Sequence, residues 1–430
     1  MLAIKFLSYL VFLLFLALAL ETYADSSNEK QFIITEEQAI AIFYQRNLSL
    51  IAASFNIDDA QAQEVIAGAI PNPVFSFTWS SLTPKMFNHQ FSNISSLPAV
   101  SPQIQQLIET AGKRRLRIES SELAVEAVNF DLKDTARILT NAVRHSYYNL
   151  LLAQKTAQVA NENFQRYQEI LRVNAVRLKV GDIAASEFTR IEVESFKAQG
   201  DQDLAKAALN QARADLLLVL GWPENSLDIM AVENWPEMSN NFKQTKQDQL
   251  VKLAIEHRPD LLAAQTRIEQ AKKAFTLAKR LTIPDVTVSA FFQRDPGNFF
   301  TDSGGIGFSV PVPLFYRQEG EISRAHIGLN TAELAVKQTE LNIRAEVMKA
   351  WAAWQSAADI SQRFESSVVK RIEMLRKTQE IAYEKGAVGL LDLIDAERSY
   401  KAMMLEYYTA LTNRSNAWAD LLMAYGEEIK

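Results

Sequence analysis

The sequence predicts a mainly helical fold with a small β part, in which one structural unit occurs twice. Three observations lead to this prediction: paired motifs at nearly constant offsets, two very long stretches without proline, and short alternating segments before each of them. The chain has 430 residues, a formal net charge of −6 and no cysteine. This charge leaves no basic surplus to neutralise phosphates, which argues against a nucleic-acid partner. Without cysteine, disulfides and thiolate metal sites are excluded.

Residues 1–24 have the pattern of a secretory signal peptide. Lys5 supplies a positive charge, an apolar stretch covers residues 6–20, and Ala24 ends a small-residue site where cleavage is expected. An uncleaved membrane anchor is the alternative. No run of about 18 apolar residues follows Ala24, so no membrane-spanning helix is expected in the mature chain.

Four pairs of similar motifs indicate an internal duplication. The pairs are Gly181 with Gly386 and Gly221 with Gly426, each 205 residues apart, and Leu48 with Leu261 and Pro71 with Pro284, each 213 apart. A single duplication followed by one small insertion or deletion explains both offsets. We therefore divide the mature chain into a first structural repeat, residues 25–235, and a second, residues 236–430.

Each repeat has the same predicted order of elements. A helix at about residues 35–69 or 247–281 is followed by a β-hairpin at about 72–110 or 284–314. No proline lies between Pro102 and Pro223 or after Pro313. Proline costs a helix interior about 3 kcal/mol, so these gaps predict long helices at about 113–180 and 318–385. Each would be about 100 Å long, which suggests a coiled coil or an extended helical array. Turns near 181 and 386 then lead to shorter return helices, at about 183–220 and 390–425.

The β segments alternate in a way that suits a membrane. In residues 285–294, Val286, Val288, Ala290 and Phe292 share one face, and in residues 304–315 apolar residues alternate with glycine and serine. The turn between these strands is predicted at residues 295–304. Strands of about ten residues with such alternation are typical of membrane barrels, although one segment alone would also fit a soluble hairpin. Four strands cannot close a barrel, and open edges are not tolerated in lipid, so several chains would have to share one. Three chains would supply twelve strands.

At this point the sequence resembles the TolC-type outer membrane factors, most closely the CzcC-like branch, over nearly the whole mature chain. The resemblance rests on the duplication, on IPNP before the first strand, on SVPVPLF at the end of the last strand, and on the glycine breaks. Its most specific part is GAVGLLDLIDAE, which begins at Gly386. It implies a homotrimer with a twelve-stranded outer-membrane β-barrel that continues into a periplasmic α-helical barrel.

The resemblance also implies roles for residues at the two turns. Asp392 and Asp395 would point into the tunnel near its periplasmic entrance, where three copies would form acidic rings that attract cations. Glu187 and Tyr383 match positions that help to hold the entrance closed, and Val388 replaces an arginine of a well-known relative. A periplasmic adaptor would dock on the hairpin tips, which comprise Leu178, Gly181, Ile183, Gly386, Val388, Gly389 and Leu390. The simpler interpretation of the acidic residues, Glu397 included, is stabilisation of a helix start by its dipole.

No catalytic group is predicted. The four histidines, His89, His145, His257 and His326, have no metal-ligand spacing, and no nucleotide or cofactor motif occurs, so we expect neither an enzyme nor a bound cofactor or metal. The resemblance implies an outer-membrane duct that exports heavy-metal cations or drugs together with an adaptor and a proton-driven inner-membrane pump of the RND type. The alternatives are a duct for type I protein secretion and a periplasmic coiled-coil scaffold without a pore.

Overall fold

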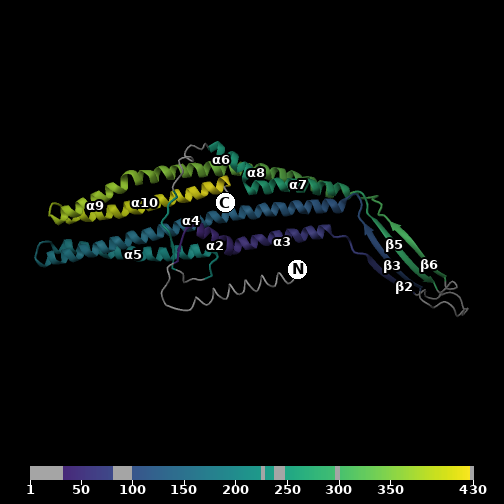
Figure 1. Cartoon of the computed structure of the whole chain (residues 1–430), viewed down its shortest axis with the longest axis horizontal. Coiled ribbons are helices and arrows are strands. Elements are labelled where there is room, and N and C mark those ends of the chain that lie inside the picture. The colour runs from purple at the N-terminus through teal and green to yellow at the C-terminus, as the bar shows by residue number, and fades with distance from the viewer. Residues whose placement is uncertain (1–31, 81–98, 224–227, 237–246, 296–300, 427–430) are drawn as a thin grey trace, which may run out of the picture. The chain divides into compact units, whose positions relative to one another are not determined.

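The computed structural model describes residues 32–80, 99–223, 228–236, 247–295 and 301–426 (Figure 1). The predicted signal peptide lies outside these ranges. The chain forms two compact units, each built from separate segments. One, called here the sheet unit, comprises residues 43–145, 235–370 and 413–430; the other, the hairpin unit, comprises residues 1–42, 146–234 and 371–412. Each unit contains residues from both predicted repeats. The units therefore do not coincide with the repeats, and the repeat boundaries stay a prediction from the sequence.

The sheet unit contains an antiparallel four-stranded sheet. Its strands are β2 (Val74–Ser80), β3 (Ala99–Ile108), β5 (Val286–Asp295) and β6 (Thr301–Ser309), in the order β2-β3-β5-β6. Large apolar side chains are exposed on it, including Phe75, Trp79, Ile306 and Phe308. β6 already begins at Thr301 and pairs with β5, so the predicted turn at 295–304 was too long. An ion pair joins the two strands there, with Arg294 Nε on β5 3.0 Å from Asp302 Oδ1 on β6.

A buried lysine fixes the sheet to the helices of this unit. Lys113, the first residue of α4 (Lys113–Lys179), is 3% exposed, and its Nζ lies 2.8 Å from Asp285 Oδ1 at the start of β5. The same oxygen accepts the Thr110 backbone N–H at 2.8 Å. This charged pair holds α4 and β5 at a defined position, because loss of Asp285 would leave the buried charge of Lys113 unpaired.

The two helices predicted before the β-hairpins are each divided in the structure. α2 (Glu36–Arg46) and α3 (Leu48–Gly68) are separated at Asn47, whose side chain accepts the Leu50 N–H at 2.9 Å as an N-cap. α6 (Gln247–His257) and α7 (Pro259–Arg280) are separated at Arg258. The residue before proline disfavours the helical conformation, and Arg258 accordingly has ψ 127°. The prediction of continuous helices at 35–69 and 247–281 was therefore wrong.

The apolar core of the sheet unit lies among α6, α7, α8 (Glu319–Arg363) and the end of α10 (Leu390–Tyr425). Its buried members are Leu250, Ala254, Leu261, Ile343, Val347, Trp354, Ala417, Leu421 and Ala424. The predicted long helix at 318–385 is not uniform, because a π-helical turn, η2 (Phe364–Val368), separates α8 from α9 (Val369–Glu384). α4, by contrast, runs for 67 residues as predicted.

The hairpin unit contains the ends of both long helices and the helices that return from them. α4 is followed by α5 (Ala185–Leu220), and α9 is followed by α10. A short parallel pair, β1 (Phe32–Ile34) with β4 (Ile229–Ala231), was not predicted. The Gln154 side chain satisfies both backbone groups of Ala231, accepting its N–H at 2.8 Å and donating to its carbonyl at 3.1 Å.

These observations confirm the predicted fold class, mainly α with a small β part. Over the residues that the structure describes, each helix falls short of the combined length and apolar character that crossing a membrane requires.

Candidate functional site: the two hairpin turns

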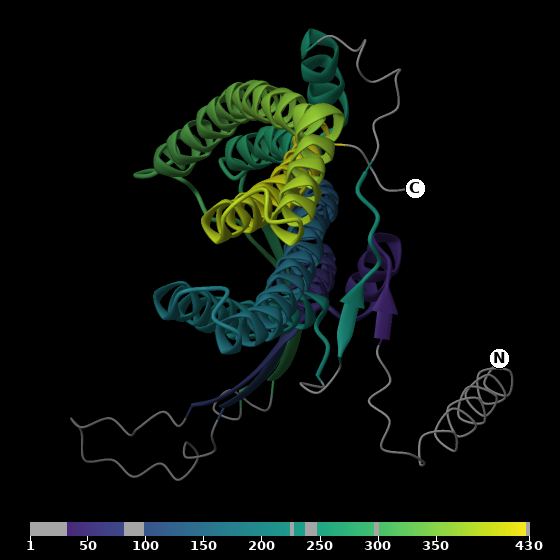
Figure 2. The same cartoon turned by 90° about the vertical axis from the view of Figure 1, so that its left-hand side faces the viewer.

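α4 and α9 each end in a turn that leads into a return helix (Figures 1 and 2), and the two turns have the same backbone geometry. Gly181 has φ 78° and Gly386 has φ 72°, so both predicted glycine breaks are helix ends in the left-handed conformation. At the first turn the Asp182 N–H donates to the Arg177 carbonyl at 2.9 Å, and at the second the Ala387 N–H donates to the Ala382 carbonyl at 2.8 Å. Each glycine N–H also donates to the carbonyl three residues earlier, at 3.1 Å for Gly181 and 3.0 Å for Gly386, and the two bonds at each turn form a Schellman motif that satisfies the last helical carbonyls.

A compact apolar cluster lies behind the turns. Its buried members are Tyr167, Ile170, Ile191, Ala198, Tyr383, Leu390, Leu393 and Ile394, which come from α4, α5, α9 and α10. Val388 packs against this cluster from outside. Apolar side chains from four helices thus hold the two hairpins against each other.

The predicted tip residues differ in how much of their surface is accessible. Gly181, Gly386 and Gly389 are exposed, whereas Leu178, Ile183 and Val388 are half-buried and Leu390 is buried. Leu390 therefore contributes to the cluster and not to an open surface. Val180 and Leu391, which the sequence did not single out, are exposed large apolar residues next to the turns.

Tyr383 connects the second hairpin to α4. The residue is 9% exposed, its hydroxyl donates to Asn174 Oδ1 at 2.6 Å, and the Arg177 guanidinium lies 5.0 Å from the ring centroid. Asn174 is fully buried and donates from Nδ2 to the Ile170 carbonyl at 2.8 Å. Asn174 and Arg177 were missed because nothing in the local pattern of a long polar helix distinguishes them.

The predicted acidic residues of the turns are on the surface. The Asp395 carboxylate is 72% exposed and lies 3.7 Å from Arg398. Asp392 is exposed and its Oδ2 accepts the Gly389 N–H at 3.1 Å, so it also caps the start of α10. Glu187 is exposed in the first turn of α5. Of the hydrogen bonds and ring contacts between described residues, those of Tyr383 go to Asn174 and Arg177 and not to Glu187.

Further along the hairpins, charged pairs join α10 to α5. Arg398 pairs with Glu194, and Lys401 pairs with Asp201. The hydrogen bond from Arg398 lowers the pKa of the Glu194 carboxyl below its usual value, despite the opposing effect of burial. These contacts continue the attachment of the second hairpin beyond the apolar cluster.

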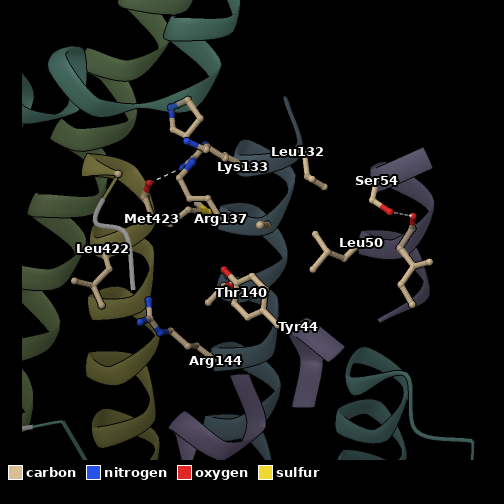
Figure 3. A pocket seen from close by; sticks show the side chains of 14 residues that line it. Tyr44, Leu50, Ser54, Leu132, Lys133, Arg137, Thr140, Arg144, Leu422 and Met423 are labelled. Carbon is tan, nitrogen blue, oxygen red and sulfur yellow. Dashed lines mark hydrogen bonds between the residues drawn. The ribbon is translucent and has the colours of Figure 1, made fainter. Parts of the chain in front are cut away.

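A separate pocket of about 430 Å³ lies in the sheet unit, between α3, α4 and the end of α10 (Figure 3). Leu50, Leu132 and Leu422 are among its apolar lining residues, and Arg137 donates there to the Met423 carbonyl. The predicted gate and tip residues all lie elsewhere. Within the described ranges, His, Asp and Glu side chains do not gather in threes as a metal site would require.

Comparison with known proteins identifies the family. The model of the family described as outer membrane efflux protein matches residues 40–222 and 250–427. The cobalt-zinc-cadmium resistance protein CzcC of Cupriavidus metallidurans is 22% identical over 88% of this chain and 86% of its own length. The cation efflux system protein CusC of Escherichia coli is 25% identical over 83% of this chain and 78% of its own length.

Solved structures show the same fold. The outer membrane protein VceC of Vibrio cholerae aligns with a TM-score of 0.73 at 18% identity, over 91% of this chain and 96% of that one. A CusC crystal structure aligns with a TM-score of 0.73 at 18% identity, over 94% and 96% of the two chains. The matches cover both hairpins and the sheet, and the chain therefore belongs to the outer membrane efflux protein family, as an outer-membrane channel protein and not an enzyme.

Proposed function

We propose that the protein is the outer-membrane duct of a tripartite efflux system and that three copies form the duct. The observation that carries this proposal is the four-stranded sheet, which among the described residues ends in two edge strands, β2 and β6, each paired on one side alone. Open edges are not stable in lipid, and three such sheets would close into a twelve-stranded barrel. The exposed aromatic and aliphatic side chains of these strands, such as Phe77 and Phe308, suit contact with lipid.

The cargo that the comparisons favour is a metal cation. Relatives of this chain are named for cobalt, zinc and cadmium resistance and for cation efflux, and another for pyoverdine export. The duct has no energy source of its own in this proposal. A proton-driven inner-membrane pump of the RND type supplies the energy and also selects the cargo. A periplasmic adaptor links the pump to the hairpin tips, where exposed Val180 and Leu391 would add apolar contact area to the turns.

The gate of the duct is formed by the second hairpin. Asp392 and Asp395 are three residues apart on α10 and exposed, which leaves both free to face a tunnel. In a trimer they would place about six negative charges in one ring, where screening by salt is weaker than on an open surface. Tyr383 holds this hairpin to α4 through Asn174, and Glu187 adds a further acid at the entrance.

Single-channel recording of the purified protein in a planar lipid bilayer tests the duct directly. We expect uniform conductance steps from a species that cross-links as a trimer, and block by a multivalent cation added on the side of the helices. A trimer that never conducts would support the periplasmic scaffold instead.

Deletion of the gene in cells tests the cargo. We expect greater sensitivity to cobalt, zinc or cadmium only in cells that contain the cognate pump. Loss of a secreted protein with unchanged metal sensitivity would favour the type I secretion duct.

A further inference from the structure

The seam between α4, α9 and α10 contains a buried carboxylate, Glu397. This residue is 2% exposed, and among the described residues its Oε1 accepts no hydrogen bond. Its nearest ion-pair partner is Arg166 on α4, with Nε 3.9 Å from that oxygen. Buried polar groups in folded proteins are nearly always hydrogen-bonded, so an unpartnered carboxylate oxygen in a helical seam requires an explanation.

Arg166 is already bound to another carboxylate. Its Nη1 lies 2.7 Å from Oε1 of Glu380 on α9, the distance of a strong charge-assisted hydrogen bond. The 3.9 Å separation from Glu397 allows electrostatic attraction but no hydrogen bond. In this arrangement Arg166 ties α4 to α9, and Glu397 on α10 is left without a donor on that side.

A second arginine in the seam is also incompletely satisfied. The Arg376 guanidinium lies 4.0 Å from the centroid of the Tyr400 ring, and its buried Nε has no hydrogen-bond partner among the described residues. The seam therefore contains an acceptor and a donor that both lack a hydrogen bond, on Glu397 and Arg376. Burial raises the pKa of Glu397 above its ordinary value of 4.5, although Arg376 and Arg166 act in the opposite direction.

Charged groups from α4 and α9 surround Glu397 in the seam. Those that act on Glu397 directly are Arg376 and Glu380 of α9 and Arg166 of α4. Glu397 in turn acts on Tyr400, together with Glu162 and Glu373, and on Tyr167, together with Asp395, Arg398 and Glu194, the last from the adjoining helix α5. Glu380 disfavours the ionised form of Glu397, whereas the two arginines favour it. Glu194 is already paired with Arg398, which leaves Glu380 as the direct competitor for Arg166.

We propose that Glu397 is a proton-responsive residue that decides whether Arg166 ties α4 to α9 or to α10. When protonated, Glu397 needs no counter-ion, and Arg166 stays on Glu380 as the structure shows. When Glu397 releases its proton to solvent, its carboxylate draws Arg166 and Arg376 toward α10. The Arg166–Glu380 bond from α4 to α9 is then lost. At that level of the seam the second hairpin is held to α4 through α10, while the Tyr383–Asn174 hydrogen bond still joins α9 to α4 nearer the turn.

The chain has no cysteine, so spin labels can be attached to introduced cysteines without first replacing native ones. Gln165 on α4 and Lys377 on α9 are exposed and flank the Arg166–Glu380 pair. Pulsed electron paramagnetic resonance on the full-length Gln165→Cys, Lys377→Cys protein would measure the α4–α9 distance as a function of pH. We expect the distance distribution to widen or lengthen as the pH rises through a midpoint above 4.5.

Two variants distinguish proton exchange from a purely structural role. Glu397→Gln keeps the shape but cannot ionise, so the distribution should stay in its low-pH form at every pH. Glu380→Gln removes the competitor, so ionised Glu397 gains Arg166 at once and the midpoint measured by the infrared carboxyl band of Glu397 should fall by about one unit or more. A pH-dependent distance that persists in Glu397→Gln overturns the proposal, as does an unchanged midpoint in Glu380→Gln.

These measurements report the hairpin contacts alone, so they stand apart from the proposed duct function. Conductance recorded on the same variants adds the link between them. A proton-dependent distance with no conductance would leave the switch in place and reject the duct, whereas steady conductance with a pH-independent distance would reject the switch.

Discussion

The first hairpin, α4 with α5, and the second, α9 with α10, share a backbone design but carry different side chains. Both turn at a left-handed glycine with nearly the same φ, 78° and 72°. At the repeat offset of 205 residues, Asp392 corresponds to Glu187, so each hairpin has an acid six residues after its glycine. Asp395, however, corresponds to Arg190, and buried Tyr383 corresponds to Leu178.

In the proposed duct, this difference would let the two copies of one duplicated unit perform different tasks. In the first hairpin the acid and the arginine offset each other's charge, whereas in the second both positions are acidic. α4 is continuous over 67 residues, but the second long helix is interrupted by the π-helical turn at Phe364–Val368, a feature often found at functional sites. The first hairpin therefore suits a rigid support, and the second suits a charged element that moves.

The largest effect is expected from the acids of the second hairpin. The double change Asp392→Ala with Asp395→Ala should reduce cation preference and block by multivalent cations by about tenfold or more, because a focused charged ring raises local counter-ion concentration by at least that factor. Bilayer recording measures both quantities. Glu187→Ala is the matched control in the first hairpin, and we expect it to change them far less. Equal effects in the two hairpins would contradict the assignment of the gate to the second one.

The two glycine turns should respond alike. Gly181→Val and Gly386→Val should each cost about 1–2 kcal/mol of stability, since the left-handed conformation is unfavourable for residues with a Cβ. A Cβ at either glycine would meet no atom within 4 Å, so the cost comes from the backbone and not from a clash. Urea unfolding measures the change. Cross-linking to the adaptor should fall in both variants while the trimer still forms, and unaltered cross-linking would remove the turns from the docking surface.

The Tyr383 hydroxyl should contribute about 1 kcal/mol to the attachment of the second hairpin. Tyr383→Phe removes the donor to Asn174 and leaves a buried amide oxygen unpaired. Hydrogen exchange along α9 should become faster, and the open probability of the channel should rise. A double-mutant cycle with Asn174→Ala isolates the pair. If the two changes add independently, the hydrogen bond does not contribute to closure.

The smallest effect is expected at Glu194, and its dependence on pH is opposite to that of Glu397. Because Arg398 lowers the pKa of Glu194, the pair contributes stability above the ordinary pKa of 4.5, and this is lost as the pH falls through the lowered value. Glu397, with a raised pKa, contributes stability below 4.5 that is lost as the pH rises through its own value.

Thermal unfolding of Arg398→Gln between about pH 3 and pH 8, a range that includes the ordinary carboxyl pKa values, tests the pH dependence of the Glu194 pair. We expect a loss below about 1 kcal/mol at neutral pH, since Arg398 is half exposed and Lys197 and Lys401 also favour the Glu194 carboxylate, and no loss at the acidic end. A loss of the same size at every pH would show that Arg398 acts by packing and not by charge.

The sequence by itself determined the features that depend on local chemistry. The absence of proline predicted the long helices, and glycine predicted where they end. Alternation of apolar with small or polar residues located strands such as β5 and β6. The break at Arg258 could also have been found, since Pro259 follows it directly. Such features follow from the conformational preferences of a few neighbouring residues, so a single sequence contains the information.

Only the tertiary structure decided which side chains meet. The β1–β4 pair joins segments about 200 residues apart, and three-residue strands are too short to show alternation. Asn174, Arg166 and Glu380 gain their roles from partners on other helices. Asp392 and Glu397 sit one and a half turns apart in the same motif, yet the first is exposed and the second is buried in the seam. The packing of neighbouring helices sets burial, and burial is what gives a carboxylate an altered affinity for protons.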